Sequence, residues 1–254
     1  MKESSVERST QIGCDIPTSL KAVALAEKYP DIFSATVWFH PESAQDVTNY
    51  LLVEEFEKIV IEKRKYIVAI GETGLDFHYL DGTDGGKIAI ALSNLSEKAK
   101  SQIENQKNWW RIQFELAEKY NLPLVIHTRD ARNATLEFMK SEGISRAVMH
   151  CFSEDWDFAR ELMDFSDNIY FSFSGIVTYK NAQKIQEAAQ KIPLNRILVE
   201  TDAPFLAPQP VRGQVCEPAF TRYTLEKIAE LRGVSVEAIE DVIYENSLRF
   251  YQIW

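Results

Sequence analysis

Residues 196–206 read RILVETDAPFL, and this stretch decides the fold. Its apolar run shows no alternation with polar residues, which is typical of a strand buried on both faces of a parallel sheet. Pro204 ends the run, because a proline cannot donate a hydrogen bond to a neighbouring strand. The sequence therefore places two carboxylates, Glu200 and Asp202, at the C-terminal end of this predicted strand.

Three earlier stretches repeat this pattern, in which an apolar run finishes on a residue type that binds metals. They are YIVAIGETGLD (66–76) with Glu72, LPLVIHTRD (122–130) with His127, and RAVMHCFS (146–153) with His150. The C-terminal ends of parallel strands meet at one edge of a sheet. We therefore predict that Glu72, His127, His150 and Asp202 converge on a common cation.

Strands and helices alternate along the chain, which predicts right-handed βαβ units and a parallel sheet. Polar residues follow at least five strands, a distribution that favours a TIM-type (β/α)8 barrel over an open doubly wound sheet. We expect one domain over residues 1–254, although a closed barrel has eight strands and the pattern predicts seven. Those seven are 9–14, 33–39, 66–71, 123–127, 146–151, 169–174 and 196–200.

Residues 77–104 interrupt the alternation. A loop with GTDGGK is followed by a short apolar patch and a polar helix, so we predict an insertion that serves as a lid or a partner surface. An amphipathic helix is predicted to resume at residues 109–120. Its Trp109 and Trp110 are expected to pack in the core or at an interface rather than to stack on bases.

The composition limits the classes of protein that the chain can belong to. The chain has 254 residues and a net charge of −10. It has no long uncharged apolar stretch and no apolar core of a signal peptide, so no membrane span is predicted and a cytoplasmic location is expected, or a nuclear one in a eukaryote. Three isolated cysteines predict no disulfide framework. The acidic charge argues against sequence-blind binding of nucleic acid, unless divalent metals supply positive charge at the site.

Three of the four histidines, His40, His127 and His150, directly follow apolar runs. A single histidine in such a place is more often a satisfied, partly buried side chain than a ligand, and three together are less easily explained by chance. Gly71 and Gly74 flank Glu72 and permit a tight backbone there, so both Glu72 and Asp76 are candidates to face a cavity. The alternative for these acids is an ordinary turn or cap.

Mixed histidine and carboxylate ligands are typical of Zn²⁺, Mn²⁺ and similar ions in hydrolases. One or two divalent ions (Mg²⁺, Mn²⁺ or Zn²⁺) would lower the pKa of a bound water and polarise the scissile bond. Asp202 is the candidate that orients this water and takes its proton. Arg129 and Arg212 are candidates for holding a phosphate or carboxylate, with surface ion pairs as the alternative.

The chain resembles the TatD family of metal-dependent hydrolases, often called TatD-type deoxyribonucleases. This resemblance implies a TIM-type barrel, one to three divalent metals, and hydrolysis of phosphodiester bonds, usually in DNA. It also implies metal-ligand roles for Glu72, His127, His150 and Asp202. The matching stretches, in family order, are FHP (39–41), GETGLD (71–76), LPLVIHTRDA (122–131), HCFS (150–153), SGIVTYKNA (174–182), LVETDAP (198–204) and, more weakly, PVRGQVCEP (210–218).

The sequence departs from the family pattern in three places. The family's first strand carries a His-x-His pair, whereas the first histidine here is His40. We therefore expect either that the protein begins upstream of Met1, or that the chain lacks the first strand and most of the first helix of the barrel, together with two ligands. Glu154 and Cys216 stand where the family usually has Gly and Asn.

Three functions follow as hypotheses. The first is a metal-dependent exonuclease acting on DNA, with Glu72 and Asp202 as catalytic residues. His40, Asp76, Arg129 and Arg212 are then the residues that contact the substrate. The second is a hydrolase of a small-molecule or aminoacyl ester, which the acidic surface favours. The third is a catalytically impaired relative that lacks the His-x-His ligands. The oligomeric state stays open.

Overall fold

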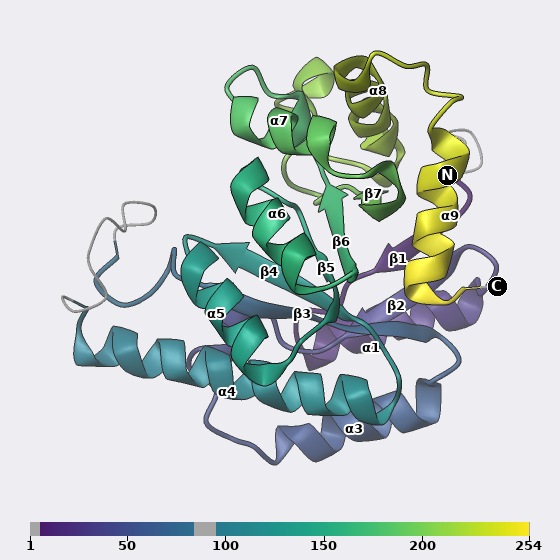
Figure 1. Cartoon of the computed structure of the whole chain (residues 1–254). Coiled ribbons are helices and arrows are strands. Elements are labelled where there is room, and N and C mark those ends of the chain that lie inside the picture. The colour runs from purple at the N-terminus through teal and green to yellow at the C-terminus, as the bar shows by residue number, and fades with distance from the viewer. Residues whose placement is uncertain (1–5, 84–94, 254) are drawn as a thin grey trace. The chain divides into compact units, whose positions relative to one another are not determined.

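The computed structural model describes residues 6–83 and 95–253 of the chain. Figure 1 shows strands that alternate with helices along this part of the sequence. Its strands are β1 (Ser9–Gln11), β2 (Phe33–Val37), β3 (Ile67–Asp76), β4 (Leu124–Arg129), β5 (Arg146–Met149), β6 (Asn168–Phe173) and β7 (Ile197–Val199). Each overlaps a segment that the sequence predicts as a strand.

The described residues form two compact units. One unit comprises residues 10–144, and the other comprises residues 6–9 and 145–253. Within the first unit, β2 pairs with β3 and β3 with β4, and all three strands are parallel. Within the second unit, β5, β6 and β7 pair in the same parallel manner. The organisation as one domain stays a prediction.

Strand β3 is longer than the predicted strand over residues 66–71. It continues through the GETGLD motif to Asp76, with a shift of register against β4 between Ile70 and Thr73. Gly71 and Gly74 have φ angles of 145° and 124°, which side-chain-bearing residues rarely adopt. Glu72 and Asp76 therefore lie within a strand rather than in the turn that follows it.

The described residues of the first unit form five α-helices. Helix α1 starts at a capping box, in which the Asp15 carboxylate accepts a hydrogen bond from the Thr18 amide at 2.7 Å. Two separate helices lie between residues 41 and 63. The five are α1 (Ile16–Lys28), α2 (Pro41–Ala44), α3 (Leu52–Lys63), α4 (Glu97–Lys119) and α5 (Arg132–Glu142).

Helix α4 begins inside the predicted insertion. It starts at Glu97, with Ser96 as its N-cap, and runs without a break through Trp109 and Trp110 to Lys119. Residues 97–104 are therefore the first turns of a helix that packs on β3, and not a separate polar helix. Residues 84–94 of the predicted insertion lie outside the described residues.

The core of the first unit is rich in aromatic side chains. Trp109 and Trp110 are fully buried, as the prediction of core packing requires. The Trp110 ring stacks on Phe138 of α5 with 4.6 Å between ring centroids, and the Trp109 ring meets Phe39 edge-on at 5.2 Å. This packing holds α4 against the segments that follow β2 and β4.

In the second unit, helices pack around β5, β6 and β7. Phe152, Phe158, Phe171 and Phe173 are fully buried and form an aromatic cluster. Asn246 of α9 donates hydrogen bonds to the carbonyls of Leu194 and Ile197, which ties α9 to the start of β7. The helices are α6 (Trp156–Phe165), α7 (Gln183–Lys191), α8 (Thr221–Arg232) and α9 (Glu240–Tyr251), with short 3-10 helices η2 (Gly175–Thr178), η3 (Leu194–Arg196), η4 (Gln209–Val211) and η5 (Pro218–Phe220).

Among the described residues, none of the helices combines the length and the apolar character that crossing a bilayer requires.

Candidate metal centre

His127 lies near the end of β4 and is held between two carboxylates of β3. Its Nδ1 atom is 2.9 Å from Oε1 of Glu72, and its Nε2 atom is 2.9 Å from Oδ2 of Asp76. Gly74 is the register partner of His127, and a Cβ atom at Gly74 would lie only 2.1 Å from the His127 carbonyl oxygen. The glycine therefore permits the close approach that brings Glu72 and Asp76 to the two nitrogens of one imidazole.

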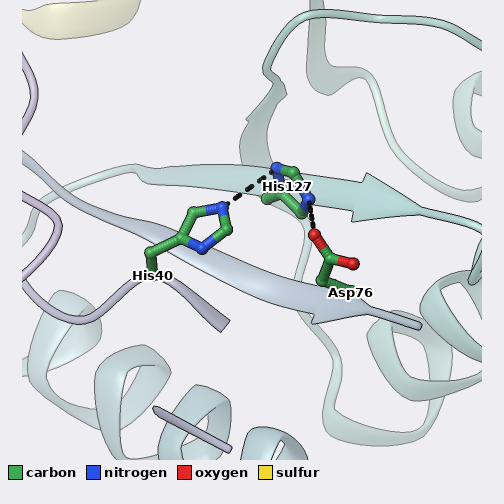
Figure 2. A group of neighbouring side chains, drawn as sticks. All are labelled: His40, Asp76 and His127. Atoms are coloured by element: carbon green, nitrogen blue, oxygen red, sulfur yellow. Dashed lines mark hydrogen bonds and ion pairs between the residues drawn. The ribbon is translucent and has the colours of Figure 1, made fainter. Parts of the chain in front are cut away.

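His40 completes this cluster from the segment after β2. It is the N-cap of α2, and its Nδ1 atom accepts a hydrogen bond from the Glu42 amide at 3.2 Å. Its Nε2 atom then faces inward, 3.4 Å from Nδ1 of His127 and 3.7 Å from Oε1 of Glu72. Figure 2 shows the rings of His40 and His127 and the Asp76 carboxylate converging. The two ring centroids are 4.5 Å apart.

The three side chains of His40, Asp76 and His127 can each offer one ligand atom to a metal ion. These atoms all lie within 4.8 Å of one another. Asp76 is 2% exposed and Glu72 is 7% exposed, so the carboxylates are largely removed from water. Two imidazoles and two buried carboxylates are a donor set that suits Zn²⁺ or Mn²⁺. The residues present therefore fit a divalent cation.

The charges in this cluster shift the pKa values of its members. Burial raises the pKa of Asp76, but the hydrogen bonds and charges of His127 and Arg129 outweigh it, and the net effect lowers the pKa to about 2. Burial lowers the pKa of His127, but hydrogen bonds to Asp76 and Glu72 outweigh this and raise it above the ordinary value of 6.5. The negative charge around the imidazole thus attracts a cation, which is a proton when no metal is present.

Arg129, a predicted phosphate-binding residue, is engaged with the same carboxylate. Its Nε atom donates to Oδ2 of Asp76 at 2.9 Å, and a terminal nitrogen lies 2.6 Å from that oxygen. Its guanidinium also lies 4.7 Å from the centre of the Tyr79 ring. Arg129 thereby orients Asp76. Its contacts in the structure are those of an ion pair, which was the alternative to phosphate binding.

His150 and Asp202 lie in the second unit, at the ends of β5 and β7. The Nδ1 atom of His150 is 2.8 Å from Oε1 of Glu200, and its Nε2 atom is 3.5 Å from Oδ1 of Asp202. Glu200 also accepts a hydrogen bond from the Cys151 amide at 2.9 Å. Glu200 is thus a further acid at this histidine, and the sequence analysis did not include it among the candidate ligands.

Cys151 follows His150 and is packed, as expected. Its Sγ atom is 3.0 Å from the hydroxyl of Ser174. Burial, together with the negative charges of Glu200 and Asp202, raises the pKa of the Cys151 thiol to about 12, despite the opposing effect of His150. The thiol is therefore protonated at neutral pH and is not a nucleophile of this site.

Arg212, the second predicted phosphate-binding residue, follows η4 in the second unit. Its guanidinium lies 4.4 Å from the centre of the Tyr179 ring, and the Tyr179 hydroxyl donates to the Ala207 carbonyl at 3.0 Å. Arg212 is exposed. The side chain is therefore held by stacking while its donors face water.

The structure brings the predicted ligands together in two pairs, Glu72 with His127 and His150 with Asp202. Each pair lies within its own unit, and the binding of one cation by all four residues stays a prediction. His40 and Asp76, which were predicted to contact substrate, lie beside His127 and offer ligand atoms. No sequence pattern distinguishes these two roles, because a histidine after a strand fits both.

Comparison with known proteins agrees with the resemblance. The family model described as "TatD related DNase" matches residues 1–252. An uncharacterized metal-dependent hydrolase of Bacillus subtilis, YabD, is 39% identical over 254 residues, which cover 99% of this chain and 90% of YabD. Another, YcfH of Escherichia coli K12, is 36% identical over 224 residues, which cover 87% of this chain and 74% of YcfH.

Solved structures give the fold. YjjV, a TatD homolog from E. coli K12, superposes with a TM-score of 0.83 at 22% identity, covering 99% of this chain and 89% of YjjV. A phosphotriesterase homology protein from E. coli, whose structure holds phosphate in the active site, superposes with a TM-score of 0.62 at 16% identity and covers 94% of this chain and 80% of that one. The predicted α/β fold of TIM type is confirmed.

Proposed function

Because the chain belongs to the TatD family of metal-dependent hydrolases, we propose that it hydrolyses phosphodiester bonds of DNA as an exonuclease. The observation that carries the proposal is the cluster of His40, Asp76 and His127, in which Asp76 is buried and both histidines are half-buried, with Glu72 at hydrogen-bonding distance from His127. Gathering two imidazoles and two carboxylates at one place away from water costs free energy unless a partner compensates their charge. A bound cation accounts for this arrangement.

The residues have distinct tasks in this proposal. His40, Asp76 and His127 hold a divalent ion, and Glu72 serves as a further ligand. When bound, Mg²⁺, Mn²⁺ or Zn²⁺ lowers the pKa of water and polarises the phosphoryl oxygen. Arg129 keeps Asp76 ionised and oriented, because its Nε atom and one terminal nitrogen contact Oδ2 of that carboxylate.

Asp202 is the proposed base that takes a proton from the attacking water. Its side chain is 34% exposed, so it reaches solvent, whereas Asp76 is buried and paired. His150, at 3.5 Å, restricts the position of its carboxylate. Arg212 is the proposed phosphate contact, because an exposed guanidinium stacked on Tyr179 keeps its donors available in a chain with a net charge of −10.

A nuclease assay tests the proposal. Single-stranded and duplex DNA labelled at either end is incubated with the chain and Mg²⁺, Mn²⁺ or Zn²⁺. We expect stepwise shortening from one end, which stops in EDTA and in His127→Ala. His78→Ala is the matched control, because the His78 ring pairs with Asp130 and the variant keeps the backbone amide that donates to Asp76. Intact DNA with every metal, under conditions in which the chain binds that metal, would contradict a DNA substrate.

A second candidate is hydrolysis of a small phosphodiester or carboxylic ester by the same residues. The net charge of −10 favours it, since a strongly acidic protein repels a long polyanion. Chromogenic phosphodiesters and aminoacyl esters are the substrates for this test. Turnover of these, abolished by His127→Ala and without cleavage of DNA, would favour the second candidate over the first.

A further inference from the structure

We infer that Gln106 of α4 is a positioning residue, which sets the place of Asp76 relative to His40 in the candidate metal centre. The inference rests on the proposed metal-dependent function, but not on the choice of DNA as substrate. The side chain of Gln106 does not itself contact the ligand atoms of His40, Asp76 or His127. Its amide instead holds the backbone segments from which two of the three candidate ligands extend.

The Gln106 side chain makes two hydrogen bonds to the backbone of Asp76. Its Oε1 atom accepts from the Asp76 amide at 2.9 Å, and its Nε2 atom donates to the Asp76 carbonyl at 2.8 Å. A primary amide has one acceptor and one donor group in the same plane, as a peptide group has. Gln106 therefore pairs with Asp76 as a residue of a neighbouring strand would.

The length of β3 explains why a side chain takes the place of a neighbouring strand at Asp76. Strand β2 pairs with β3 only as far as Ile70, whereas β3 continues to Asp76. On the other side, Asp76 is in register with Arg129 of β4. The last residues of β3 thus extend past the end of β2, and Gln106 supplies the hydrogen bonds at Asp76 that β2 does not reach.

The same helix also holds the segment that carries His40. The Nε2 atom of Gln106 lies 3.5 Å from Oε1 of Gln45, the residue at the C-terminal end of α2. The neighbouring Asn105 donates to the Gln45 carbonyl at 3.1 Å. Since His40 caps the other end of this short helix, α4 fixes α2 and Asp76 to one rigid element.

Burial distinguishes Gln106 from an incidental contact. Its side chain is 1% exposed, in a helix turn otherwise packed on the strand. A buried amide without its partners would be strongly destabilising, so its hydrogen bonds are firmly held. Residues behind metal ligands typically change metal affinity about ten- to a hundredfold when they are replaced.

Gln102, one helical turn earlier, is the matched control. It is also a buried glutamine of α4 with two hydrogen bonds, one from the Asp81 amide at 2.8 Å and one to Asp46 at 3.1 Å. Neither partner belongs to the metal group. Gln102→Met and Gln106→Met therefore remove the same chemical group from the same helix, and only the second removes the two hydrogen bonds to the Asp76 backbone.

The test measures the dissociation constant of Mn²⁺ and Zn²⁺ by calorimetry, with the melting temperature in EDTA recorded for every variant. We expect Gln106→Met to weaken metal binding at least tenfold, while Gln102→Met lowers the melting temperature and leaves the dissociation constant unchanged. Gln106→Glu keeps the size and the acceptor but loses the donor to the Asp76 carbonyl, so it should fold and also bind metal more weakly.

Three results would overturn the inference. Wild-type affinity in Gln106→Met and Gln106→Glu would show that Asp76 needs no such support. An equal loss in Gln102→Met would show a general effect of destabilising α4. Absence of metal binding in the wild type would overturn the inference together with the metal-dependent function. Metal binding without DNA cleavage would affect only the proposed substrate.

Discussion

At the scale of single residues, His127 is the side chain that contacts every other member of the candidate metal centre. Both of its ring nitrogens face carboxylates, and a third contact joins it to His40. In the metal-free chain the raised pKa of His127 favours an imidazolium between Glu72 and Asp76, and in the proposed function a divalent ion takes the place of that proton. A proton and a metal therefore compete for the same buried negative charge.

This competition predicts the pH dependence of the metal-free chain. The pKa of His127 is raised above 6.5, so its charged form stabilises the fold fully below pH 6.5, and this contribution is lost as the pH rises through the raised pKa. The pKa of Asp76 is lowered from 3.8 to about 2, so its contribution is present above pH 3.8 and is lost as the pH falls through about 2.

The measurement is thermal unfolding in EDTA at a series of pH values for the wild type and Asp76→Asn. We expect the melting temperature of the wild type to exceed that of the variant by the largest margin between pH 3.8 and 6.5. At more alkaline pH we expect a smaller difference. A difference that grew as the solution became more alkaline would show that His127 is neutral between the two carboxylates.

Sequence alone identifies some of these residues and not others. Glu72, His127, His150 and Asp202 stand out because each is a metal-binding type that closes an apolar run. Gln106 does not stand out, because a glutamine within a polar helix looks like a solvated residue until the length of β3 is known. Glu200 is visible beside Asp202, but nothing in the stretch indicates which of the two carboxylates lies nearer to His150.

At the scale of elements, helix α4 links core packing to the candidate site. Its Trp109 and Trp110 are both buried, but their indole nitrogens differ. Trp109 donates to the Val47 carbonyl at 2.9 Å, whereas the Trp110 nitrogen has no hydrogen-bond partner among the described residues. The two side chains thus separate the contribution of shape from that of the hydrogen bond.

Replacing each tryptophan by phenylalanine tests this difference. Both changes remove a similar volume, but only Trp109→Phe breaks a hydrogen bond, which is partly buried, so it should cost about 0.5–1.5 kcal/mol more in the free energy of unfolding than Trp110→Phe. Urea unfolding of the two variants gives the comparison. An equal or larger loss in Trp110→Phe would show that the stacking of Trp110 on Phe138 dominates instead.

The strands were predictable and their exact extents were not. Apolar runs located the strands β4, β5 and β7 and the start of β3, because both faces of a parallel sheet are buried. The strand was predicted to end at residue 71, yet Gly71 and Gly74 let β3 continue to Asp76 at close distance to β4. A glycine pair signals unusual backbone, but it does not say whether the strand ends there.

At the scale of the whole molecule, the family could be predicted because its motifs occur in order along nearly the full chain. The match of the family model to residues 1–252 agrees with this. The substrate could not be predicted in the same way. A net charge of −10 opposes binding of a polyanion, while a metal centre favours it locally, and composition does not decide between these effects.

Metal binding should also stabilise the folded chain as a whole. A ligand at about 100 times its dissociation constant adds about 2.7 kcal/mol to the stability of the state that binds it. We expect Mn²⁺ to raise the melting temperature of the wild type and of His78→Ala, and to leave that of His127→Ala unchanged. A shift of equal size in all three proteins would place the binding outside the His127 cluster.

The central claim is that His40, Asp76 and His127 hold a divalent cation. Its most direct test is a crystal structure of the chain grown with Mn²⁺, with anomalous diffraction to locate the ion. We predict an anomalous peak within about 2.0–2.3 Å of a His127 nitrogen and an Asp76 oxygen, at the distances usual for such ligands. A structure in which His127 keeps its hydrogen bonds to Glu72 and Asp76, and the ion lies elsewhere or is absent, would contradict the claim.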